Sequence, residues 1–101
     1  MEFEACTLPT PERPLRVAEF DALFASVRSA ERVAPTRLRL ALDGGGAAAL
    51  AADLAVRETA CCAFFTFTLT VTGAGTDLEV TVPAGHVAVL DALAARAGAA
   101  R

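Results

Sequence analysis

The chain has 101 residues, of which 54% are hydrophobic and 21% are charged, and its formal net charge is −3. This length and composition predict one folded domain covering residues 1–101 rather than a disordered segment. The nine basic residues are spread thinly and include no lysine. Because nucleic-acid binding depends on clustered cations, the sequence argues against a nucleic-acid partner.

The localisation is predicted from what the chain does not contain. No apolar stretch reaches the roughly 18–20 residues of a membrane span, and the acidic start does not resemble a signal peptide. We therefore expect a cytoplasmic protein with no membrane partner, whose three cysteines are thiols rather than disulfides. The alanine surplus leaves little polar surface, which makes a homodimer a candidate assembly.

The first third of the chain predicts a strand followed by a helix. Residues 3–8 (FEACTL) have the composition of a short strand, and three prolines after them end regular structure. Residues 15–32 are predicted as one helix because apolar side chains recur at intervals of three and four. The residues that form this apolar face are Phe20, Leu23, Phe24 and Val27. Pro35 is expected to separate this helix from the next element.

A strand and a second helix are predicted next. Residues 36–43 (TRLRLALD) alternate between leucines and polar side chains, the pattern of a half-buried strand with Arg37 and Arg39 on its solvent face. Asp43 and the three glycines after it predict a turn. Glycine-rich segments can also bind phosphate, but the Gly-Lys-Ser/Thr of a phosphate-binding loop does not follow here. Residues 47–62 are predicted as the second helix.

The last third predicts a hairpin and a third helix. The segment FFTFTLTVT alternates apolar and threonine side chains, Gly73-Ala74-Gly75 turns the chain, and DLEVTV alternates again. A helix over 87–97 follows Pro83. The predicted order is β-α-β-α-β-β-α. The fold class is therefore α+β, a single domain with an antiparallel or mixed sheet whose helices pack on one face.

The strongest candidate for a chemical site lies at the end of the second helix. Glu58 precedes Cys61 by three residues and Cys62 by four, the two spacings that bring helical side chains into contact. A carboxylate near an apolar stripe is costly unless it is compensated, and thiolates select soft metals. The predicted metal ligands are therefore Cys61, Cys62 and Glu58, with Cys6 as a third thiolate if the N-terminal strand passes nearby. His86 is a candidate fourth ligand.

This cluster also carries a resemblance. The segment RETACCAFFTFTLTV resembles a small, poorly characterised bacterial domain family that has a Glu-x-x-Cys-Cys-x-Phe-x-Phe-like segment and is associated with heavy-metal resistance. The resemblance covers residues 52–76 best and implies a thiol function for Glu58, Cys61 and Cys62. Ala63 stands where the family pattern has proline, which puts the local turn in question.

The leading hypothesis is cytosolic binding of a soft metal or metalloid, with Zn, Cu(I), Hg(II) and As(III) as candidates, for sequestration, delivery or sensing. One alternative is a thiol-dependent redox enzyme. It is less favoured because the end of a helix and the Glu58 carboxylate both disfavour a thiolate at Cys62 without a cation. The other alternative is a non-catalytic structural homodimer whose cysteines are buried as small apolar side chains.

Overall fold

The computed structural model describes residues 13–43, 45–61 and 63–99, and it shows three helices and one four-stranded sheet. The predicted strand over residues 3–8 lies outside this described part of the chain. The elements in chain order are α1 (Arg13–Phe24), β1 (Val27–Ala34), β2 (Arg37–Leu42), α2 (Gly45–Cys61), β3 (Thr66–Thr72), β4 (Gly75–Thr81), the short 3-10 turn η2 (Ala84–His86) and α3 (Val87–Ala99).

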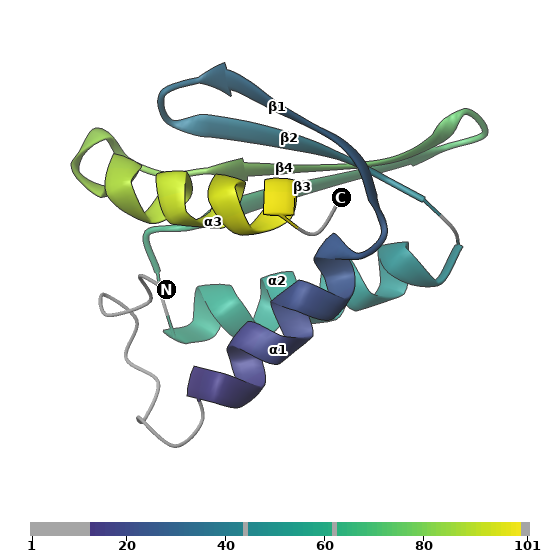
Figure 1. Ribbon diagram of the computed structural model, residues 1–101, viewed down its shortest axis with the longest axis horizontal. Coiled ribbons are helices and arrows are strands. Elements are labelled where there is room, and N and C mark those ends of the chain that lie inside the picture. Colours follow the sequence, from purple (N-terminus) through teal and green to yellow (C-terminus); the bar gives the residue numbers. More distant parts are fainter. Residues whose placement is uncertain (1–12, 44, 62, 100–101) are drawn as a thin grey trace.

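The sheet is antiparallel throughout and has the order β1-β2-β4-β3. It consists of two hairpins, β1–β2 and β3–β4, whose inner strands β2 and β4 pair along their whole length. All three helices lie on one side of the sheet (Figure 1). The helices contact different strands of the sheet: α3 packs on β1 and β2, whereas α2 packs on β3. The α+β class and the single helical layer predicted from the sequence are confirmed.

The core lies between the helices and one face of the sheet. Strand β2 contributes every second residue, and β4 does the same, as expected of strands with one buried face. Helices α1 and α3 add side chains at intervals of three and four. The buried residues of these four elements are Leu38, Leu40, Leu42, Leu78, Val80, Phe20, Leu23, Phe24, Val89, Leu90, Leu93 and Ala97.

One element differs from the sequence prediction. The predicted helix over 15–32 ends at Phe24, and residues 27–34 form β1, which pairs with β2. Val27 is buried as predicted, but it is buried as the first residue of a strand. Pro35 lies in the turn of the β1–β2 hairpin instead of separating a helix from a strand. The helical spacing from Phe20 to Val27 was misleading because pairing with β2, a contact made later in the chain, decides the conformation.

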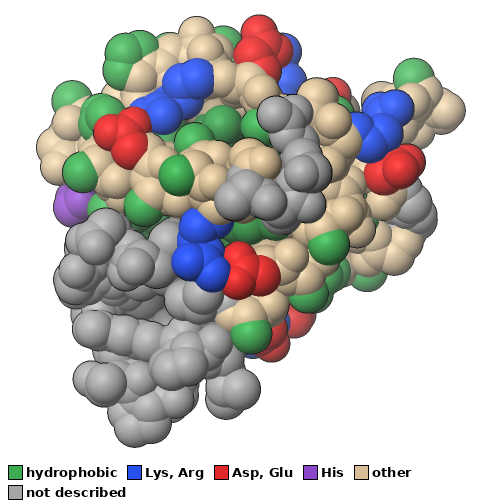
Figure 2. Space-filling view, in the orientation of Figure 1, with side chains coloured by type: hydrophobic (Ala, Val, Ile, Leu, Met, Phe, Trp, Pro, Cys, Tyr) green, Lys and Arg blue, Asp and Glu red, His purple; other side chains and the backbone are tan. Residues whose placement is uncertain are grey.

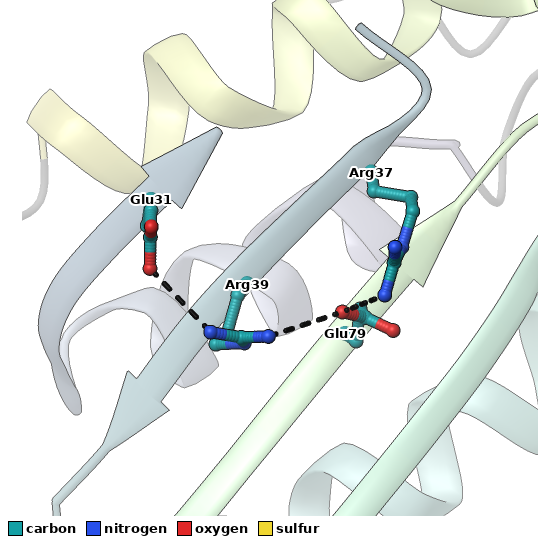
Figure 3. Close-up of polar contacts among 4 residues, drawn as sticks. All are labelled: Glu31, Arg37, Arg39 and Glu79. Atoms are coloured by element: carbon teal, nitrogen blue, oxygen red, sulfur yellow. Dashed lines mark hydrogen bonds and ion pairs between the residues drawn. The ribbon is translucent and has the colours of Figure 1, made fainter. Parts of the chain in front are cut away.

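The opposite face of the sheet is polar. Arg37 donates a hydrogen bond to Glu79 at 2.9 Å, and Arg39 lies 3.7 Å from Glu79 and 3.6 Å from Glu31 (Figure 3). The two arginines are exposed, as predicted for the solvent face of a strand. On the face of the molecule seen in Figure 2, basic side chains also alternate with acidic ones.

None of the helices in the described residues is long and apolar enough to cross a membrane.

Candidate functional site

The candidate site begins with the buried face of α2. Ala47, Ala51, Leu54 and Glu58 are all buried, and they follow one another at intervals of four, three and four residues. This is the spacing of a single helical stripe, and the alanines in it let the helix lie close to its neighbours. Glu58 therefore occupies a position that the pattern assigns to an apolar residue.

Glu58 has an exposed fraction of 0%, and within the described part of the chain it is the one charged residue that is buried. Transferring an isolated carboxylate out of water costs several kcal/mol, so such residues are retained where they pair with a cation, accept hydrogen bonds or coordinate a metal. The sequence places Glu58 near the apolar stripe of its helix, and in the structure its side chain is buried on that stripe.

The neighbouring residue Arg57 points to a different set of partners. Its guanidinium donates to Glu19 of α1 and to Asp53 of α2, each at 2.8 Å. The hydrogen bond with Glu19 is the main cause that raises the pKa of Arg57 above its ordinary value, and Asp53 adds to it. The contact with Glu19 joins α1 to α2 one residue before Glu58, whereas the contact with Asp53 lies within α2.

Of the three cysteines predicted as ligands, only the backbone of Cys61 lies in the described part of the chain. Cys61 is the last residue of α2, three residues after Glu58, but its side chain is not among those described. Cys62 and Cys6 lie outside the described residues. The proximity of Cys62 to Cys61 and Glu58 stays a prediction from the helical spacing, and that of Cys6 stays a prediction that depends on the path of the N-terminal strand. Across the residues that are described, no group of three or more His, Cys, Asp or Glu side chains is arranged to hold a metal ion.

An aromatic cluster follows the cysteine pair. Phe64 stacks on His86 with ring centroids 4.0 Å apart and an interplanar angle of 5°. Phe64 also contacts Phe65, which is buried, and Phe65 contacts Phe67 at the start of β3. The stack fixes the imidazole of His86, at the end of η2, beside a residue that follows Cys62 by two positions.

The stack of His86 on Phe64 was not predicted from the sequence. His86 is distant from Phe64 in the chain, and the two come together because β3 leads into β4, and β4 returns the chain to η2 near the residues that precede β3. The signal available in the sequence was the length of the hairpin. Strands of equal length return the chain to the point at which it left, so a histidine just after β4 falls near the residues just before β3.

Comparison with known proteins adds no assignment. No protein-family model matches this chain, and neither a search of curated proteins nor a search of solved structures finds a match. The resemblance to a heavy-metal-associated bacterial family therefore stays a prediction from the segment around Glu58, Cys61 and Cys62.

Proposed function

We propose that this protein binds a soft metal ion or metalloid through the vicinal pair Cys61 and Cys62, with Glu58 as an oxygen ligand or as an acceptor next to the metal and Cys6 as a third thiolate. The observation that carries this proposal is the complete burial of Glu58 on the stripe of α2 that leads to Cys61. A carboxylate and two sulfurs within about one helical turn concentrate negative charge, and a bound cation offsets it.

Binding is favoured over catalysis for an electrostatic reason. Cys61 is the last residue of α2, where the helix dipole is negative and destabilises an anion by about 0.3–1 kcal/mol. A nucleophilic cysteine needs the opposite environment, such as a helix N-terminus or a nearby cation. A soft metal supplies the positive charge itself and displaces the thiol protons when it binds, so the same position suits a metal ligand.

The donor set limits the metals considered. Two thiolates are too few for a closed tetrahedral zinc site, which takes four protein ligands. Three thiolates with Cys6 suit trigonal coordination of As(III), Hg(II) or Cu(I), since soft ligands select soft acceptors. His86 is the candidate that would complete a zinc site, and its stack on Phe64 supports this role because the ring is held near the residues after Cys62.

The test is native mass spectrometry of freshly reduced protein with Zn(II), Cu(I) or As(III) added separately. We expect one bound metal or metalloid per chain, and loss of that mass shift in the Cys61→Ser, Cys62→Ser double variant. Glu58→Gln should weaken binding by about 10–100-fold, the range for groups that support a metal site. His86→Ala should weaken Zn(II) binding more than As(III) binding.

Two controls make the result specific. The Thr59→Ser variant leaves the donor set unchanged and reports non-specific effects of substitution at the end of α2. Measurement of the protons released on binding distinguishes thiolate coordination from surface adsorption, because thiols lose their protons when they coordinate. The proposal fails if the double cysteine variant takes up all three species as the parent does, or if the reduced parent takes up none.

A further inference from the structure

The two edges of the sheet are built differently. The outer strand β1 shows register shifts on both sides of its central residues and carries three charged side chains, Arg28, Glu31 and Arg32. Irregular pairing and charge are the devices by which edge strands avoid pairing with other chains. The other outer strand, β3, has neither device. Its seven residues contain no charge, no proline and no glycine, and they pair with β4 in unbroken register.

Strand β3 is also accessible in the described part of the chain. Its four threonines are exposed, and Val71 has an exposed fraction of 62%. Phe67 and Leu69 are half-buried on the side of the helices. The hairpin that β3 forms with β4 extends beyond the helices at its tip (Figure 1). Alternate residues of such an outer strand direct their backbone N–H and C=O groups away from the sheet, where they can accept another strand.

We propose that β3 pairs antiparallel with β3 of a second copy of this chain, about a two-fold axis at Leu69, so that two four-stranded sheets become one eight-stranded sheet. The argument is the symmetry of the strand sequence, Thr-Phe-Thr-Leu-Thr-Val-Thr. With Leu69 opposite its own copy, Phe67 lies opposite Val71 and Thr68 lies opposite Thr70. Every threonine then faces a threonine, and every apolar side chain faces an apolar one.

This self-complementarity is the reason for choosing a second copy as the occupant. An isologous interface requires one patch to match itself under a two-fold rotation, and β3 does so at all seven positions. Cross-strand pairs of threonines and of apolar side chains each stabilise an antiparallel ladder. A one-residue slip would instead place threonines opposite apolar side chains and direct the two helical layers to opposite faces.

The net charge of the chain does not oppose this pairing strongly. The carboxylates nearest to the interface, Asp77 and Glu79, lie on β4, opposite Thr70 and Thr68. Across the joined sheet the two β4 strands are separated by three strand spacings, or about 14 Å. This distance exceeds the Debye length of about 8 Å at physiological ionic strength, so the repulsion is largely screened.

The test uses lysines at positions that face one another across the proposed axis. The Thr68→Lys, Thr70→Lys double variant places like charges opposite each other between copies, while within one chain each lysine lies opposite a carboxylate of β4, which favours a folded protein. We expect a monomer–dimer equilibrium for the full-length parent in sedimentation velocity, and a dissociation constant at least about tenfold higher for this variant. The Thr68→Lys, Thr70→Glu variant places opposite charges across the axis and should retain the dimer.

Matched controls place a lysine on two other exposed valines of the described chain. Val33→Lys lies on β1 and Val56→Lys on the outside of α2, and both should leave the dissociation constant within about twofold of the parent. Hydrogen exchange adds a second readout, since amides of β3 should exchange more slowly as the protein concentration rises. The inference is overturned if the parent is monomeric up to about millimolar concentration, or if either control dissociates the dimer while the double-lysine variant does not. It is also overturned if the β3 amides that point away from β4 are protected in monomeric protein, which would mean that another segment of the same chain covers this edge.

Discussion

The buried face of α2 can be tested by a pair of substitutions only two residues apart. Leu54 has an exposed fraction of 1% and lies one turn before Glu58, whereas Val56 has an exposed fraction of 70%. Leu54→Ala removes three carbons from the core, a transfer loss of about 2.4 kcal/mol at roughly 0.8 kcal/mol per carbon. The cavity left behind brings the expected loss to about 3 kcal/mol, within the usual range of about 2–5 kcal/mol.

Val56→Ala is the control. It removes two carbons from a residue of which less than a third of the surface is buried. The transfer loss is then about 0.5 kcal/mol, and alanine recovers a similar amount through its higher helix propensity, up to about 0.7 kcal/mol. We expect no measurable change in the free energy of unfolding.

The assay for both variants is urea denaturation followed by circular dichroism, with thermal unfolding as a second measurement. For a chain of this size, a loss of about 3 kcal/mol should lower Tm by about 12–24 °C. If the two variants are equally stable, or if Val56→Ala is the weaker protein, then α2 does not pack on the face that contains Glu58. The argument that its carboxylate is buried would lose its basis.

Two further predictions concern the turn of the second hairpin and the contact between the first and third helices. Gly75 has a φ of 147°, which residues with a side chain rarely adopt, so Gly75→Ala should lower the free energy of unfolding by about 1–3 kcal/mol. The control is Gly73→Ala, whose added methyl group meets no atom within 4 Å and which should be neutral or stabilising in the same urea assay. Arg96 donates two hydrogen bonds to Asp21, at 3.0 and 2.5 Å, and this contact raises the pKa of Arg96 above its ordinary value. A raised arginine pKa contributes stability that is fully present at every pH below the ordinary arginine pKa. The coupling energy in a double-mutant cycle of Arg96→Met with Asp21→Asn should therefore be about 1 kcal/mol or less at both pH 6 and pH 9, and should fall with added salt. A coupling that changed sign between these pH values would contradict this prediction.

Most of the fold follows from short-range patterns in the sequence. Strand β2 and the β3–β4 hairpin alternate with a period of two, and α2 shows the helical spacing over its whole length, so each was predicted near its observed bounds. These elements have one buried face each. A single buried face imposes a regular pattern, which is what sequence reasoning can detect.

Strand β1 was missed because it lacks such a pattern. Along the strand the residues are buried, exposed, exposed, half-buried and then mostly exposed. The register shifts twice, and within the described residues no strand pairs with its outer side. Phe20, Leu23 and Phe24 immediately before it form a true helical face, and Val27 continues that spacing by coincidence. The pairing with β2 cannot be seen in any window of the sequence that ends at Arg32.

The candidate site divides in the same way. The burial of Glu58 was predictable because Leu54 and Ala51 set the face of the helix on which it lies. The stack of Phe64 on His86 was not, because it depends on where the β3–β4 hairpin returns the chain. The side chains of Cys61 and Cys62 are not described, so their predicted approach to Glu58 rests on helical spacing alone.

The proposed metal site lies a few residues before the proposed interface strand in the chain. We nevertheless expect metal binding and dimer formation to be independent. Cys61 ends α2, and β3 begins at Thr66. If two β3 strands pair about Leu69, each Thr66 lies three residues from the axis, and the two copies of Thr66 are about 20 Å apart along the strands. We therefore expect each cysteine pair to lie on its own side of the axis, too far from the other pair to share one metal.

We therefore expect the parent and the Thr68→Lys, Thr70→Lys variant to bind the same amount of As(III) or Zn(II), one per chain, with affinities that agree within about twofold. The measurement is a metal titration of both proteins, above and below the concentration at which the parent dimerises. One metal per two chains in the parent, or a loss of binding in the monomeric variant, would show that the site is completed by the second copy and that the two-fold axis is not at Leu69. Loss of binding only in the double cysteine variant would leave both proposals standing, since a site within one chain does not depend on the pairing of β3.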